Sequence, residues 1–101
     1  MNIQKLMKQA QQAQAQMAAV QDELARETVE ASAGGGMVKV VMTCNRNLRD
    51  ITIDPDAVDP EEVELLQDMV LAAVNEAARM AEDVSAAKME EVTGGLSIPG
   101  F

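Results

Sequence analysis

The sequence predicts an α+β fold in which two long helices flank a three-stranded antiparallel sheet, in the order α-β-β-β-α. Apolar residues recur at alternating spacings of three and four over residues 2–26 and again over 60–92, as expected for helices with one apolar stripe. Between them, residues 28–54 contain β-prone runs separated by two turn-forming segments, 34–36 and 45–47. This pattern is typical of a strand meander between two helices.

The first helix, over residues 2–26, is rich in Gln and Ala, which suit a solvated helix beside an apolar seam. At about 1.5 Å per residue it would run roughly 37 Å and the last helix roughly 49 Å, whereas a compact domain of this length has a radius of gyration near 13 Å. We therefore expect the two apolar ladders to contact a second chain, in a homodimer whose helices project from a small sheet. The candidate interface residues are Ile3, Leu6, Ala10, Met17, Val20, Leu24, Val70, Ala73, Ala77, Met80 and Val84.

Three strands are expected between the helices. The segment 28–33 alternates at period two, and the glycines at 34–36 supply a turn that tolerates positive φ. The run 37–44 is strongly β-prone and largely apolar on both faces, which favours a central strand with both faces partly covered. A tight turn at 45–47 then leads into the third strand, 48–54.

The last helix has the clearest predicted start, with Asp59 as N-cap, Pro60 at the first helical position and carboxylates in the first turn. Gly94 and Gly95 predict its end, because glycine tolerates the left-handed cap conformation. The apolar side chains of the following tail suggest that it docks onto a helix. We therefore expect one domain over 1–101, made of a helical arm (1–27), a sheet (28–54), a long helix (60–92) and a tail (93–101).

The net charge of −9, from 17 acidic and 8 basic residues, argues against nucleic-acid binding, which depends on Lys and Arg replacing condensed counterions. The charges are segregated, however. Residues 1–21 contain Lys5 and Lys8 with no acidic side chain, while residues 54–64 hold six carboxylates. With one Phe and no Trp or Tyr, recognition of single strands by base stacking is disfavoured.

The composition also argues against catalysis and metal binding. The chain has no His, and its single Cys44 lies in an apolar strand, which excludes nucleophile–His pairs, an intrachain disulfide and a Cys-rich zinc site. An enzyme would have to use carboxylates or lysine. The spacing of Asp54, Asp56 and Asp59 invites a cation site, but turn and capping roles explain these residues better. We expect no cofactor and no metal, and the polar N-terminus without a long apolar run predicts a cytoplasmic protein.

Several fragments, in their order and spacing, resemble one known family. They are LMKQAQQ at 6–12, GMVKV at 36–40, ITIDP at 51–55, AAVNEA at 72–77, and KM at 88–89 followed by TGGL at 93–96 and PG at 99–100. The chain is similar in these fragments to the YbaB/EbfC family of bacterial nucleoid-associated proteins. The resemblance implies an α-β-β-β-α protomer, a tweezer-like homodimer with arms of packed helices, and sequence-tolerant binding of double-stranded DNA in the nucleoid. The first helix departs from the family pattern in having only Lys5, Lys8 and Arg26 as basic residues.

Two functional hypotheses follow. The first is a homodimeric nucleoid protein that binds double-stranded DNA and influences nucleoid organisation or gene expression. Its candidate phosphate contacts are the basic residues with few acidic neighbours in sequence, Lys5, Lys8, Lys39, Arg46 and Arg49, whereas Arg79 is expected to pair with acidic residues one helical turn away. The second hypothesis is an acidic protein-interaction module for replication or recombination factors, with no direct DNA contact.

Overall fold

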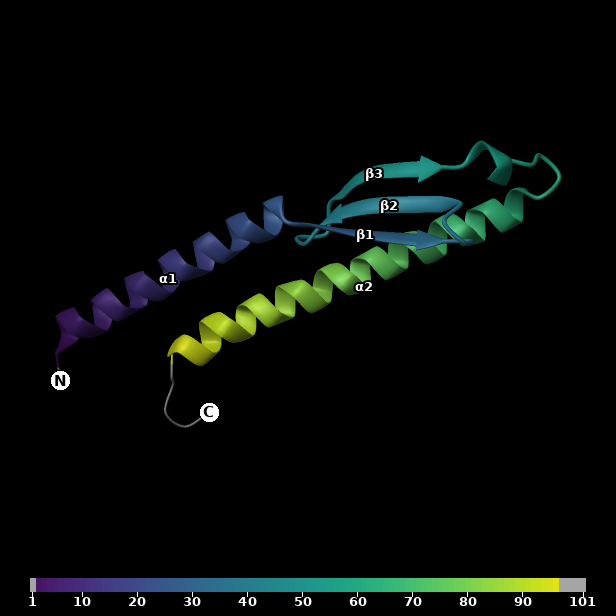
Figure 1. Ribbon diagram of the computed structural model, residues 1–101. Coiled ribbons are helices and arrows are strands. Elements are labelled where there is room, and N and C mark those ends of the chain that lie inside the picture. The colour runs from purple at the N-terminus through teal and green to yellow at the C-terminus, as the bar shows by residue number, and fades with distance from the viewer. Residues whose placement is uncertain (1, 97–101) are drawn as a thin grey trace.

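The computed structural model describes residues 2–96 and has the predicted order of elements (Figure 1). These are the helix α1 (Ile3–Arg26), the strands β1 (Thr28–Ala33), β2 (Val38–Thr43) and β3 (Leu48–Ile53), the short 3-10 helix η1 (Pro55–Ala57) and the helix α2 (Val63–Leu96). The α+β protomer is therefore confirmed. The molecule is elongated, with extents of 71 × 24 × 16 Å and a radius of gyration of 19.7 Å.

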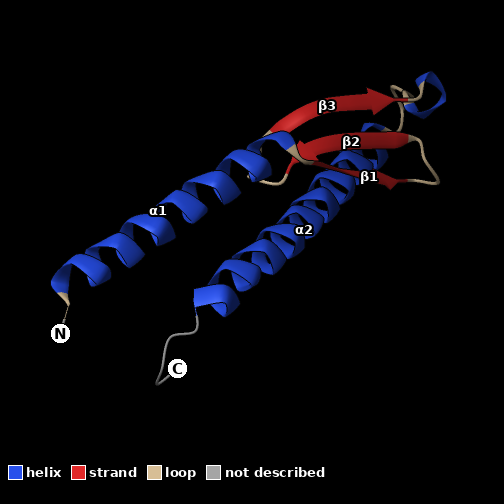
Figure 2. Ribbon diagram, turned by 60° about the vertical axis from the view of Figure 1, so that its left-hand side comes forward, coloured by secondary structure: helices blue, strands red, loops and turns tan. Residues whose placement is uncertain are grey.

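The three strands form one antiparallel sheet in the order β1-β2-β3, so β2 is the central strand, as predicted. Helix α2 covers one face of this sheet (Figures 1 and 2). On that face Val38 and Val40 belong to the same core cluster as Ala73 and Ala77, and all four side chains are fully buried. Because alanine is small, the backbone of α2 can approach the sheet closely, and this contact forms the core of the protomer.

No described helix packs on the opposite face of the sheet, where Lys39 is exposed (Figure 2). Val41 is half-buried and Thr43 is buried there, so the strand is partly covered on both faces, as predicted. Hydrogen bonds of the following turn surround Thr43, because its hydroxyl donates to Oδ1 of Asn45 and accepts from the backbone N–H of Asn47 at 2.9 Å. Within the described part of the chain, only one face of the sheet therefore has a second layer.

The turn at residues 34–36 joins β1 to β2, as predicted, and its three glycines all have positive φ. Gly34 also lies directly against α2, since a Cβ at this position would collide with Sδ of Met69. A Cβ at Gly35 would meet no other atom. Gly34 is therefore needed for both its backbone angle and its lack of a side chain, and Gly35 for its backbone angle alone.

Both predicted ends of α2 are wrong. Asp59 begins a separate turn, because its carboxylate accepts from the N–H of Glu61 at 3.0 Å and its carbonyl accepts from the N–H of Glu62 at 2.9 Å. The helix then starts at Val63 instead of residue 60. It also continues through Gly94 and Gly95 to Leu96, because glycine in a helix costs only about 1 kcal/mol and does not forbid it.

Helix α1 runs beside the C-terminal half of α2 and is fixed to the body near its own C-terminal end (Figures 1 and 2). Leu24 is buried, and its carbonyl accepts from the N–H of Asn45 at 3.1 Å. Nζ of Lys88 in α2 reaches across to the carboxylates of Glu23 and Glu27, at 3.0 and 3.4 Å. All side chains from residue 2 to residue 12 are exposed, so the first half of α1 is an arm without a layer of its own protomer over it.

Candidate nucleic-acid interface

The five basic residues singled out in the sequence are all exposed, but the protomer places them in three separate regions. Lys5 and Lys8 lie one helical turn apart near the free end of α1. Arg46 and Arg49 lie at the turn between β2 and β3, close to the base of α1. Lys39 lies on β2 toward the glycine turn, at the other end of the sheet. One protomer therefore does not bring the five charges together.

The arm end of α1 has the least opposed positive charge. No acidic residue precedes Asp22 in the chain, and Asn2 caps α1, since its side chain accepts from the N–H of Lys5 at 3.2 Å. The positive end of the helix dipole lies at the same place. Lys5, Lys8 and the helix N-terminus thus combine to make this end of the molecule suitable for phosphate contact.

Arg46 is held in an unusual backbone conformation, with φ of 72°. Its N–H donates to the carbonyl of Thr43 at 2.9 Å, and the Thr43 hydroxyl fixes the asparagine on either side of it. Its guanidinium lies 3.5 Å from the carboxylate of Glu82, with both side chains more than half exposed. Such a solvated ion pair is worth well under about 1 kcal/mol, so Arg46 can exchange this partner for a phosphate.

Arg49 lies at an irregularity in the sheet. The register between β2 and β3 shifts between Val41 and Met42, which pair with Asp50 and Leu48. Arg49 is the residue between those two partners, so it is the extra residue of a β-bulge. A β-bulge changes the direction in which a side chain leaves the strand. This bulge lies beside the turn that holds Arg46.

Arg79 is already neutralised by acidic neighbours, as predicted. Its Nε donates to Glu76 at 3.2 Å and its Nη1 donates to Asp83 at 2.9 Å. The hydrogen bond from Arg79 lowers the pKa of Glu76, and the same contact raises the pKa of Arg79. Arg79 is therefore a poor candidate for phosphate contact. It can serve as a control when the five candidate basic residues are tested.

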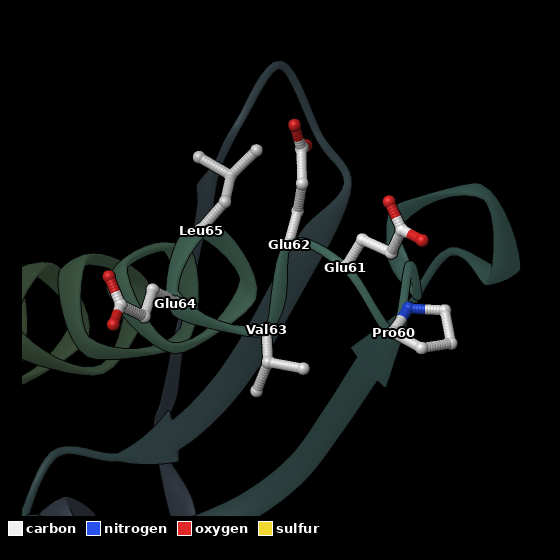
Figure 3. Close-up of a pocket in the computed structure, with 6 residues that line it drawn as sticks. All are labelled: Pro60, Glu61, Glu62, Val63, Glu64 and Leu65. Carbon is white, nitrogen blue, oxygen red and sulfur yellow. The ribbon is translucent and has the colours of Figure 1, made fainter.

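The acidic end of the molecule lies opposite the free end of α1 (Figure 1). Residues 60–65 line a shallow hollow there, and the carboxylates of Glu61, Glu62 and Glu64 point in different directions (Figure 3). Asp54 caps the short helix η1 by accepting from the N–H of Asp56 at 2.9 Å, and Asp59 accepts from the N–H of Glu61 in the same way, so the predicted turn roles are confirmed although Asp59 does not cap α2. Within residues 2–96 no group of three carboxylate or thiol side chains is arranged to hold a metal ion.

Cys44 is buried beside the base of α1. Burial raises the pKa of its thiol, and the nearby carboxylate of Glu27 raises it further. The thiol is therefore protonated at neutral pH, and it lacks the thiolate character that a nucleophile needs.

The structure divides the predicted dimer-interface residues into two groups. Leu24, Ala73 and Ala77 are buried within their own protomer, so a partner chain cannot contact them without rearrangement. The others keep accessible surface, either half-buried or exposed: Val20, Val70, Met80, Val84, Ile3, Leu6, Ala10 and Met17. The sheet of the same protomer thus covers much of the apolar stripe of α2. No element of the same protomer covers the apolar stripe at the start of α1 within the described residues.

Sequence reasoning missed an apolar groove beside β3. Ile51 and Ile53 face the α2 side of the sheet, because they pair with Val40 and Val38, yet they are 41% and 36% exposed. Helix α2 lies over β1 and β2 and leaves this third strand uncovered. The groove has a volume of about 460 Å³ and is lined by Ile53, Leu66, Gln67, Val70, Leu71 and Val74. The sequence did indicate that Ile51 and Ile53 lie on one face of the strand. It did not indicate that they are exposed, because this depends on where α2 crosses the sheet.

Comparison with known proteins identifies the family. The model of the YbaB/EbfC DNA-binding family matches residues 1–96. A nucleoid-associated protein of Acetivibrio thermocellus is 55% identical over 101 residues, covering 99% of this chain and 89% of the relative. One from Moorella thermoacetica is 53% identical over 100 residues, covering 99% and 96%.

A crystal structure of an uncharacterized Helicobacter pylori protein has the same fold, with a TM-score of 0.82 at 19% identity over 92% of this chain and 98% of that one. Neither helix within residues 2–96 is both long and apolar enough to cross a membrane. The sequence, the fold and these relatives agree, and the chain belongs to the YbaB/EbfC DNA-binding family.

Proposed function

We propose that this protein binds double-stranded DNA with little sequence specificity, as a homodimer in the bacterial nucleoid, and so influences nucleoid organisation or gene expression. The observation that carries the proposal is the separation of charge along the molecule. The end of α1 has Lys5 and Lys8 with no acidic residue before Asp22, whereas the six carboxylates of residues 54–64 lie at the opposite end. Family membership and the names of the relatives support the same function.

In this proposal the protein contacts phosphates and does not read bases. The basic side chains are exposed and lie in three separate regions, and the chain has neither Trp nor Tyr to stack on bases. Contacts of this kind position a protein on DNA without carrying sequence information. Lys5 and Lys8 would contact DNA from the arm, Arg46 and Arg49 from the base of the arm, and Lys39 from the other end of the sheet.

The homodimer would form through the apolar groove beside β3. Ile51, Ile53 and Leu71 expose 41%, 36% and 60% of their surfaces, and the groove lining is nearly all carbon. In a homodimer with its two-fold axis at this groove, these side chains of both protomers would be buried. Each Å² of apolar surface removed from water would stabilise the dimer by about 25 cal/mol. It would also cover an edge strand whose six residues are all exposed. This surface replaces Leu24, Ala73 and Ala77 in the predicted interface.

The proposal is tested by fluorescence anisotropy of a labelled duplex across a series of salt concentrations. The double variant Lys5→Ala/Lys8→Ala should bind more weakly, and the slope of log K against log salt should fall by about 0.9 for each phosphate that the variant no longer neutralises. Arg79→Ala is the matched control for each single variant, Lys5→Ala or Lys8→Ala, because it also removes one positive charge, but one already paired with Glu76 and Asp83. Equal behaviour of the control and both single variants would refute the arm as the DNA-binding surface.

A second candidate function is an acidic protein-interaction module for replication or recombination factors. The acidic end favours it, because Val58, Val63 and Leu65 are each at least half exposed among the carboxylates. In that case the duplex would not bind even at the lowest salt. A stoichiometric partner that is retained after nuclease treatment, and that Val63→Asp no longer binds, would then support the second function.

A further inference from the structure

A second apolar depression lies between the two helices, far from the sheet. It is lined by Gln16, Ala19 and Val20 of α1 and by Glu91 and Val92 of α2, and its volume is about 310 Å³. It is distinct from the groove beside β3, with which it shares no residue. Nothing within residues 2–96 fills it, although Val20 and Val92 present carbon surface to it.

The depression lies next to the place where the chain leaves α2. Val92 is four residues, or about 6 Å along the axis, before the end of the helix at Leu96. Ile98 follows Leu96 by two residues, so its Cα can lie up to about 7 Å from the helix end even when residues 98–101 form a turn. This segment can therefore reach Ala19 and Val20 on the neighbouring helix without any change in the described part of the chain.

The composition of residues 97–101 suits such a site. Ile98-Pro99-Gly100-Phe101 has Pro and Gly at the two central positions of a type II turn. Such a turn reverses the chain and brings its first and fourth residues within about 7 Å of each other. Those residues are Ile98 and Phe101, the latter being the one aromatic residue of the whole sequence. Their side chains can enter one small depression together.

We propose that residues 97–101 fold back between the helices, with Ile98 and Phe101 covering Ala19, Val20 and Val92. The described contacts between α1 and α2 include the ion pairs of Lys88 with Glu23 and Glu27, near the base of α1. The docked segment adds an apolar contact further out along the arm that carries Lys5 and Lys8. It restrains the angle of the arm, and this inference holds whether or not the arm binds DNA.

The lack of Trp and Tyr makes a direct test available, because Phe101→Trp introduces the only indole in the protein. If the segment docks, this variant emits at shorter wavelength than free indole in water and is quenched several-fold less by acrylamide. Adding Ala19→Glu places a carboxylate in the depression, and it should shift the emission to longer wavelength and restore quenching.

Ala18→Glu is the matched control for this test. Ala18 and Ala19 are both exposed on α1, and each has an acidic residue four positions later, but Ala18 does not line the depression. The control should leave the emission unchanged. Circular dichroism of all variants verifies that α1 and α2 remain folded.

Two results would overturn the proposal. An indole that is fully quenched in the Phe101→Trp protein, or that responds equally to Ala18→Glu and Ala19→Glu, would show that the segment does not occupy the depression. Emission that reverts to that of free indole over about a hundredfold dilution would show that a second copy supplies the segment. Emission that stays constant on dilution supports docking within one chain.

Discussion

Helices α1 and α2 carry similar apolar ladders, but the two ladders have different surroundings. In α2, Ala73, Ala77 and Ala81 recur every four residues and are completely buried against the sheet. In α1, Ile3 and Leu6 occupy equivalent positions in the pattern and are 69% and 50% exposed. Periodicity thus identifies which side of a helix is apolar, but it does not identify what covers that side.

The largest expected difference between the two regions comes from shortening a leucine. Leu24→Ala should lower the free energy of unfolding by about 2–5 kcal/mol, because Leu24 is 2% exposed and its truncation leaves a cavity. Leu6→Ala, on the same helix, should cost less than about 0.5 kcal/mol. Urea denaturation measures both. A large cost for Leu6→Ala would mean that a partner chain covers the arm, and would place the first ladder in the dimer interface together with the groove beside β3.

Lengthening an alanine makes the same comparison between the two helices. Ala77→Leu should destabilise the protein by about 1–3 kcal/mol, because its extra atoms separate α2 from the sheet. Ala10→Leu adds the same atoms to an exposed position of α1 and should be close to neutral. Thermal unfolding followed by circular dichroism distinguishes them. Similar melting temperatures for the two variants would contradict the tight packing of α2.

The close approach of α2 to the glycine turn gives a smaller effect. Gly34→Ala and Gly35→Ala should each cost about 1–2 kcal/mol, since both residues have positive φ. Gly34→Ala should cost more, because Met69 must also move away from the new methyl group. The difference between their denaturation midpoints isolates the contact with α2. Equal midpoints would mean that the Met69 side chain moves away from the new methyl group without a cost in free energy.

The smallest expected effect concerns the ion pairs at the base of α1. Hydrogen bonds from Lys88 to Glu23 and Glu27 raise the pKa of Lys88. Stability from these contacts is therefore fully present below the ordinary lysine pKa of about 10.4 and is lost as the pH rises through the higher folded value. The melting temperature of Lys88→Met should lie slightly below that of the wild type at neutral pH.

That difference in melting temperature should disappear at strongly alkaline pH. Deprotonation of Cys44, whose pKa burial raises, destabilises both proteins in the same direction, but not equally, because the charge of Lys88 lowers the pKa of Cys44 in the wild type. A gap that persisted at alkaline pH would assign the effect to packing of the Lys88 stem instead of its charge.

Most of the fold could be predicted from local signals, and most of the site could not. The strands, the glycine turn and the central position of β2 follow from alternation and turn residues. The start of α2 was misplaced because Asp59-Pro60 is as suitable for a separate turn as for a helix N-terminus. The groove beside β3 was missed because its exposure depends on the lateral position of α2 over the sheet, which periodicity does not encode.

The basic residues illustrate the same limit. Their exposure and the pairing of Arg79 followed from neighbours in sequence, since residues three and four apart meet on a helix. The ion pair between Arg46 and Glu82 joins residues far apart in the chain and could not be predicted in this way. The distribution of the candidate cations over three regions likewise emerged only with the tertiary arrangement.

The separation of charge along a molecule 71 Å long has a consequence for how it moves near other molecules. A net charge of −9 repels any polyanion, but the repulsion acts mainly on the end that holds residues 54–64. Near such a polyanion the protomer therefore experiences a torque as well as a force, and at low ionic strength the torque turns the acidic end outward. The chain is in effect an electric dipole, and it presents the tip of α1 first before any contact is made.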